Sequence, residues 1–103
     1  MLNEVIKQSL IANWGEKANS MNCYAEVKFV YQSSKWACYI YALNPRDEDT
    51  IQCLMSVPYA HTMEWSLNEL YFAYDSGGEH PFVDQEFRKI KVAELFRKLR
   101  EGR

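Results

Sequence analysis

The chain lacks a long apolar run, and this absence excludes a protein that crosses a membrane by a helix. No stretch of its 103 residues approaches the roughly 18–20 apolar residues that a helix needs to span a bilayer. The first residues include Asn3 and Glu4, and no apolar segment typical of a secretory signal follows them. We therefore expect a cytoplasmic protein without a membrane partner.

Glycine, proline and cysteine are also scarce. The chain has 4 Gly and 3 Pro, which argues against a disordered or low-complexity protein. Its three cysteines, Cys23, Cys38 and Cys53, are an odd number without a Cys-x-x-Cys pair, so they predict neither a disulfide framework nor a zinc site. We expect them to be small apolar residues of the core, and we expect no metal and no cofactor.

What the chain does contain is enough apolar and aromatic side chains for one core. Apolar residues make up 48% of the chain and aromatics 15%, and a length of 103 residues predicts a single domain over 1–103. Alternating apolar residues indicate strands, and apolar residues at helical spacing indicate helices. The expected elements are a helix over 2–18, strands over 24–31, 36–43, 51–57 and 64–66, a helix over 67–74, an edge strand over 81–87 and a helix over 92–101.

Two polar breaks shape the expected sheet. Residues 32–35 would join the first two strands as a hairpin, and residues 44–49, with their proline, would turn the chain into the third. The segment 36–43 is apolar on both faces, which predicts a central strand. Ser66 and Glu69 match a capping box. The prediction is an α+β fold: a mostly antiparallel sheet of four to five strands with the N- and C-terminal helices packed on one face.

The order of these motifs resembles a family of small proteins of unknown function from plasmids, phages and other mobile elements of bacteria. The resemblance would cover nearly the whole chain, and the Cys-containing strands and the basic C-terminal segment depart from it. It implies an accessory protein that binds and inhibits a host complex, plausibly a CRISPR effector, and it assigns no catalytic residue. The motifs are Val27-Lys28-Phe29, Ser34-Lys35-Trp36 with Tyr39, Asp47-Glu48-Asp49, Trp65-Ser66-Leu67-Asn68-Glu69-Leu70, and Gly78 to Pro81 running into Phe87.

Charge is distributed unevenly along the chain. The net charge is −2, but residues 44–87 hold one Arg and nine carboxylates, whereas residues 88–103 hold seven Lys or Arg and two Glu. Clustered carboxylates can mimic a phosphate backbone or dock into a basic groove of a host protein, and they can equally be ordinary surface charge. The candidate partner-binding residues are Asp47, Glu48, Asp49, Glu64 and Glu69.

The basic C-terminal segment supports an alternative hypothesis, a nucleic-acid-binding module. Lys and Arg neutralise phosphates, and exposed aromatic rings stack on unpaired bases. The net negative charge of the chain argues against this function, and a solvated helix face would also explain the charges. The candidate nucleic-acid-binding residues are Arg88, Lys89, Lys91, Arg97, Lys98 and Arg100.

No group of residues predicts catalysis. His61 and His80 lie in expected loops, and His61 precedes Glu64 by three residues without a nucleophile motif nearby. Gly77-Gly78 is too short for a phosphate-binding loop. We therefore expect a non-enzymatic protein, and a small enzyme or metal protein remains a third hypothesis. The seven tyrosines indicate either core packing or the interface of a symmetric homodimer.

Overall fold

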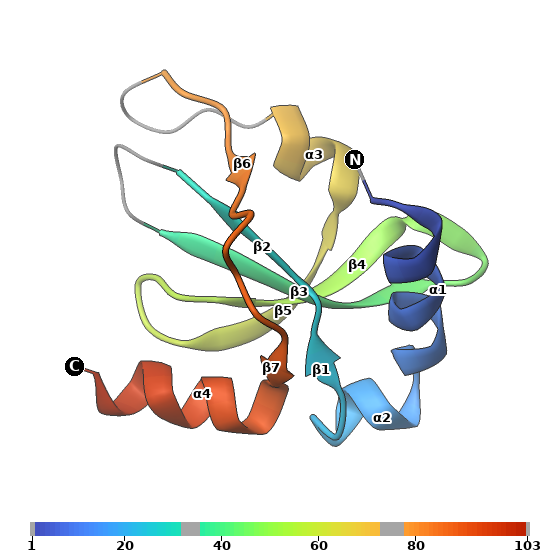
Figure 1. The fold of residues 1–103 in the computed structure, drawn as a ribbon, viewed down its shortest axis with the longest axis horizontal. Coiled ribbons are helices and arrows are strands. Elements are labelled where there is room, and N and C mark those ends of the chain that lie inside the picture. Colours follow the sequence, from blue (N-terminus) through green and yellow to red (C-terminus); the bar gives the residue numbers. More distant parts are fainter. Residues whose placement is uncertain (1, 32–35, 73–77, 103) are drawn as a thin grey trace.

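The computed structural model, which describes residues 2–31, 36–72 and 78–102, has an antiparallel sheet of five strands in the order β5-β4-β3-β2-β6 (Figure 1). Beside it, β1 and β7 pair as a second, two-stranded sheet. The predicted α+β class, antiparallel sheet and terminal helices are confirmed. The elements are α1 Glu4–Asn13, α2 Glu16–Asn19, β1 Tyr24–Ala25, β2 Val27–Val30, β3 Ala37–Asn44, β4 Asp47–Met55, β5 His61–Ser66, α3 Leu67–Phe72, β6 Phe82–Val83, β7 Ile90–Lys91 and α4 Val92–Glu101.

β3 is the central strand, as its apolar sequence predicts. Its first seven residues are buried. Successive side chains of a strand point to opposite faces, and here Ile40 belongs to one apolar cluster and Tyr39 and Tyr41 to another. The sheet is therefore covered on both faces.

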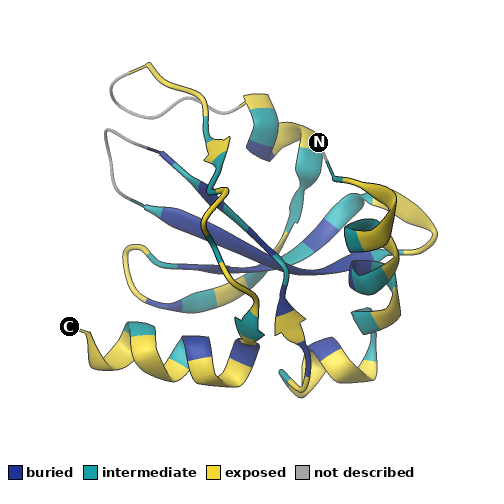
Figure 2. Cartoon of the chain, viewed as in Figure 1, coloured by how far each residue is buried: buried dark blue, intermediate teal, exposed yellow. Residues whose placement is uncertain are grey.

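The terminal helices cover opposite faces, so the expectation that both pack on one face is wrong. Leu10 of α1 lies in the cluster of Ile40, whereas Val92 and Leu95 of α4 lie in the cluster of Tyr39. Figure 2 shows the buried strands β2 and β3 running between the two helices, whose outer sides are exposed. The physical reason is that β3 presents apolar side chains on both faces, and each face needs its own covering layer.

Two expected elements are each divided in the structure. Gly15 separates α1 from α2 with a φ of +101°, a conformation that side chains other than glycine rarely adopt. The expected strand over 24–31 divides at Glu26, whose N–H donates to the Ile40 carbonyl at 3.0 Å. On one side of Glu26, β1 pairs with β7, and on the other, β2 pairs with β3 and β6.

The acidic turn is shorter than expected. Only Pro45 and Arg46 form it, because Asp47 pairs with Asn44 and already begins β4. β5 is longer than the expected strand over 64–66 and includes His61, which the sequence placed in a loop. Of the edge strand predicted over 81–87, only Phe82–Val83 form a strand, β6, because a turn follows at residues 85–86; α4 spans the predicted residues 92–101.

Ser66 caps the start of α3 as one half of the capping-box pattern predicts, whereas Glu69 binds an indole instead of reaching back to the Ser66 backbone. The Ser66 Oγ accepts a hydrogen bond from the Glu69 N–H at 3.1 Å, while the Glu69 carboxylate accepts from Trp65 Nε1 at 3.0 Å. The predicted hairpin turn over 32–35 and the last two residues of the helix predicted over 67–74 lie outside the described residues. Among the residues that the structure describes, no helix has the length and apolar character to cross a bilayer.

Candidate functional site

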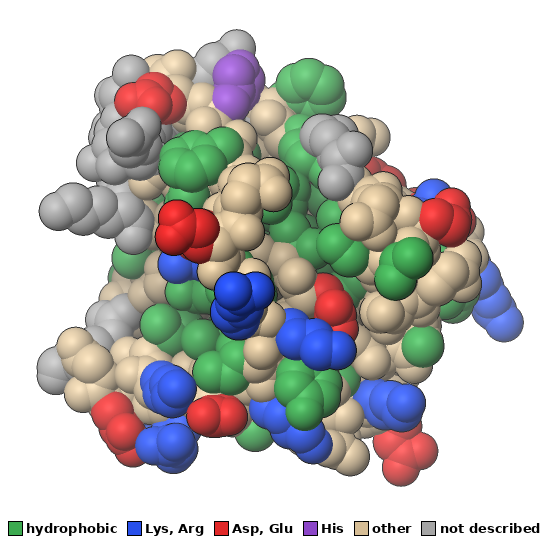
Figure 3. Space-filling model, in the orientation of Figure 1, with side chains coloured by type: hydrophobic (Ala, Val, Ile, Leu, Met, Phe, Trp, Pro, Cys, Tyr) green, Lys and Arg blue, Asp and Glu red, His purple; other side chains and the backbone are tan. Residues whose placement is uncertain are grey.

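The six basic candidates lie on one continuous stretch of structure. β7 leads directly into α4, so the basic side chains before and within β7 are followed at once by those of the helix. In Figure 3, Lys and Arg gather over the lower half of the view, where Figure 1 places β7 and α4. Between residues 88 and 101, only two carboxylates accompany these cations. We call this set the basic surface: Arg88, Lys89, Lys91, Arg97, Lys98 and Arg100.

Tyr24 brings an aromatic ring to the basic surface. The pairing of β1 with β7 places it opposite Lys91, and strand alternation puts Lys89 on the same side. The Nζ atoms of Lys89 and Lys91 lie 5.2 and 5.8 Å from the centre of the Tyr24 ring. The residue is 41% exposed. An exposed ring accompanied by two ammonium groups offers a stacking face together with positive charge.

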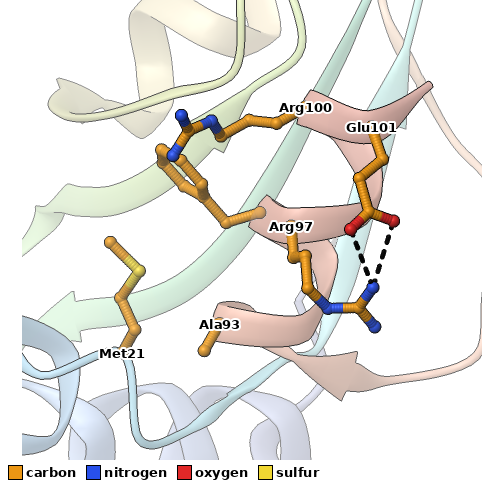
Figure 4. A pocket seen from close by; sticks show the side chains of 6 residues that line it. Met21, Ala93, Arg97, Arg100 and Glu101 are labelled. Atoms are coloured by element: carbon orange, nitrogen blue, oxygen red, sulfur yellow. Dashed lines mark hydrogen bonds and ion pairs between the residues drawn. The ribbon is translucent and has the colours of Figure 1, made fainter. Parts of the chain in front are cut away.

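A cavity of about 540 Å³ borders α4. Its volume lies within the range of roughly 300–1,000 Å³ that ligand pockets occupy. Figure 4 shows Met21 reaching toward α4 from the turn before β1, with Arg97 and Arg100 extending from the helix. The guanidinium carbon of Arg100 lies 5.7 Å from the centre of the Phe96 ring. The lining residues are Met21, Ala93, Phe96, Arg97, Arg100 and Glu101.

The backbone at Met21 is strained. Its φ is +58°, in the left-handed region that residues with a side chain usually avoid. The N–H groups of Met21 and Asn22 donate to the carbonyls of Ala18 and Lys17 at 3.1 and 2.9 Å, which is the Schellman ending of a helix. Glycine is the usual residue at this position, and methionine here places a long side chain on the wall of the cavity.

Two carboxylates partly neutralise α4. Glu101 accepts two hydrogen bonds from Arg97 Nη1 at 3.1 and 3.2 Å, and Glu94 lies 3.5 Å from Lys98 Nζ. Exposed pairs of this kind contribute little to stability, so an incoming phosphate can exchange with them at small cost. Within the described part of the chain, the remaining four cations of the basic surface, Arg88, Lys89, Lys91 and Arg100, form no ion pair.

The acidic candidates mostly have partners inside the protein. Glu48 forms an ion pair with Lys7 of α1. Asp47 accepts hydrogen bonds from the Thr50 hydroxyl at 2.7 Å and from the Asp49 N–H at 3.1 Å. Glu69 accepts from the Trp65 indole, so these three carboxylates have partners within the protein, although exposed pairs of this kind contribute little to stability.

Asp49 connects β4 with the start of α3. Its carboxylate accepts from the Ser66 hydroxyl at 2.5 Å and from the Asn68 N–H at 2.8 Å. These hydrogen bonds lower the pKa of Asp49 because they stabilise the charged form, and the bond from Ser66 has the larger effect. Glu64 is exposed on β5, as Asp47 and Glu48 are on β4 and Glu69 is on α3, so the five candidates lie on three different elements.

The histidine and cysteine candidates do not form a site. His61 and Glu64 project to opposite sides of β5, so their spacing in the sequence does not bring this base and carboxylate together. His61 Nδ1 instead lies 2.8 Å from the Tyr59 carbonyl, and His80 lies in an irregular segment. The three cysteines are free and buried, as the packing role predicts. Among the described residues, no group of three or more His, Cys, Asp or Glu is placed to hold a metal ion.

Two residues of the site, Tyr24 and Met21, were not predicted from the sequence. The sequence singles out Tyr24 only as one of seven tyrosines, because no neighbouring residue predicts that its short strand pairs with β7. Met21 gave no indication of its role, since the Schellman ending is usually recognised by a glycine that this chain lacks at that position.

A scan of the chain against models of known protein families finds no match, and neither does comparison with curated proteins or with solved structures. The resemblance to mobile-element proteins therefore remains a prediction that rests on its motifs.

Proposed function

We propose that the protein is a non-enzymatic binding protein that holds nucleic acid on its basic surface. One observation carries the proposal: the exposed Tyr24 ring lies beside the ammonium groups of Lys89 and Lys91, next to a helix that carries three more cations. Lys and Arg neutralise phosphates, and an exposed aromatic ring stacks on bases. Most acidic candidates, by contrast, already have intramolecular partners.

The net negative charge of the molecule is compatible with this function because the charges are segregated. The basic surface lies on β7 and α4, whereas most carboxylates lie in residues 44–87. Charge separated in this way orients a molecule as it approaches an anionic partner, and the effect weakens as salt increases.

The test is a titration of a fluorescent oligonucleotide with the protein, followed by anisotropy at several salt concentrations. Lys89→Gln should weaken binding and reduce the salt dependence by about one phosphate contact. Arg46→Gln is the matched control, because it removes one positive charge from the β3–β4 turn on the other side of the molecule (Figure 1). Equal effects of the two substitutions, or no binding of any oligonucleotide at low salt, would contradict the proposal.

A protein partner is a second candidate, which the edge strand β5 favours. Within the described residues, β5 pairs only with β4, and a free strand edge can accept a further strand from a partner. Val57 and Tyr59, exposed by 41% and 62%, immediately precede this strand, and Glu64 is exposed on it. Inhibition of a host complex, such as a CRISPR effector, would act through this edge.

Affinity purification from bacterial lysate, with and without nuclease, separates the two candidates. A protein that stays bound after nuclease treatment and is released by Glu64→Lys would support the edge-strand interface. Recovery of nucleic acid alone, lost on nuclease treatment, would support the basic surface instead.

A further inference from the structure

We infer that the cavity between Met21 and α4 receives an unpaired base, so that the basic surface selects single-stranded over double-stranded nucleic acid. This inference deepens the proposed function and rests on it.

The chemistry of the cavity matches a base with its phosphate. Met21, Ala93 and Phe96 supply apolar and aromatic surface, and the positive charge comes from Arg100 over the Phe96 ring and from Arg97, which also pairs with Glu101. Bases present flat faces that pack on aromatic rings and on guanidinium planes, and their phosphates attract cations. In a duplex those faces are already stacked on neighbouring bases, so only an unpaired base can enter.

The cavity and the Tyr24 ring form two places for bases along one path. Lys91 connects them: its Nζ lies 5.8 Å from the centre of the Tyr24 ring and donates to Asn22 Oδ1 at 3.0 Å. Asn22 directly follows Met21, which lines the cavity. A single strand that stacks one base on Tyr24 can therefore pass its phosphates over Lys91 and place another base against Met21.

The strain at Met21 is a second, independent observation. A left-handed residue with a side chain costs energy that glycine would avoid, and such strain is concentrated at functional sites. A glycine at this position would avoid the strain but would lack a side chain. The Met21 side chain forms the wall of the cavity that faces α4 (Figure 4).

The decisive test compares two single strands that carry the same phosphates. One is an oligothymidylate of about 12 nucleotides, a length within the usual site sizes for single strands. The other is an abasic oligonucleotide of equal length, which lacks the bases. The oligothymidylate should bind at least about 5-fold more tightly, because a single stacked base already contributes a factor of roughly 5 to 150. A duplex of the same length should bind no better than the abasic strand.

Arg100→Lys is the sharpest variant, because it keeps the charge but removes the planar guanidinium at the Phe96 ring. It should lower the ratio of oligothymidylate to abasic affinity, and Met21→Ala should do the same. Lys89→Gln is the matched control at the phosphate path, and it should weaken both strands. Arg100 is exposed, so folding of its variant is not at risk.

The outcomes distinguish the two proposals. Equal, salt-dependent binding of the oligothymidylate, the abasic strand and the duplex would overturn the single-strand inference and leave the basic surface as a general polyanion site. An unchanged ratio in both Arg100→Lys and Met21→Ala would remove the cavity as the base site. Absence of binding to all three probes at low salt would overturn the proposed function itself.

Discussion

At the scale of single residues, Asp49 shows how a carboxylate can serve the fold rather than a partner. Its pKa is lower in the folded state, so the stability that it contributes is present above its ordinary value of 3.8 and is lost as the pH falls through the folded pKa. Asp49→Ala should therefore lower the melting temperature at neutral pH and reduce the stability that the protein loses on acidification to about pH 3.

Thermal unfolding at the two pH values checks this prediction. Glu64→Ala is the control, because Glu64 is exposed on β5 and should leave the melting temperature almost unchanged. If Asp49→Ala melts at the temperature of the wild type, the carboxylate has no structural role and becomes a stronger candidate for partner binding.

Met21 offers a test of backbone strain. Met21→Gly should relieve about 1 kcal/mol of left-handed strain, which offsets the side-chain contacts that it removes. Met21→Val should be less stable than Met21→Gly by about 1 kcal/mol or more, because a β-branched side chain is poorly accommodated at positive φ. Urea unfolding measures both values. A valine variant more stable than the glycine variant would show that this backbone is not left-handed in solution.

The thiols give a simple test of burial. Burial raises the pKa of Cys23. The pKa of Cys38 is raised well above its ordinary value, chiefly by a hydrogen bond with Cys53 and also by burial. Since the thiolate is the reactive form, the native protein should react slowly with a thiol reagent at about pH 8, near the ordinary thiol pKa. Denaturant should then expose all three cysteines. Rapid reaction of one equivalent of thiol reagent with the native protein would contradict the burial of all three cysteines.

At the scale of elements, α4 depends on its apolar side for attachment to the sheet. Leu95 is 7% exposed and lies in the cluster of Tyr39. Leu95→Ala should cost about 2–4 kcal/mol in the free energy of unfolding, as is usual for a buried leucine. Lys98→Ala, on the exposed side of the same helix, should cost less than about 0.5 kcal/mol. Urea unfolding of both variants checks the difference, and a similar small cost for both would mean that α4 is not packed on the sheet.

The same elements show which parts of the fold are predictable from sequence. The bounds of α4 follow from apolar residues at helical spacing, and the central place of β3 follows from its apolar residues on both faces. That apolar character also implies two covering layers, a consequence that the single-face prediction did not include. The division at Glu26 could not be predicted, because it depends on pairing with β7, far away in the sequence.

The candidate site, like the fold, is predictable from sequence only where it depends on local patterns. Its cations are visible as a basic segment after residue 87. Tyr24 joins them only through the pairing of β1 with β7. Met21 joins them because it is left-handed, which the sequence does not indicate since the residue is not a glycine. Local patterns therefore indicated the charge of the surface, whereas its stacking ring and its cavity required the tertiary structure.

At the scale of the whole molecule, the proposed function depends on the separation of charge. A weakly acidic protein binds nucleic acid only if its cations are gathered on one side, and the basic surface has this property (Figure 3). Glu94 and Glu101 partly neutralise it. Binding should therefore be strong at low salt and should weaken steeply as salt is added.

The most direct test of this account is the dissociation constant of the protein for a fluorescent oligothymidylate, measured by anisotropy from low to physiological salt. Three or four phosphate contacts predict that log Kd rises with log salt with a slope of roughly 2 to 3. A slope near zero, or no change in anisotropy even at the lowest salt, would contradict binding through the basic surface.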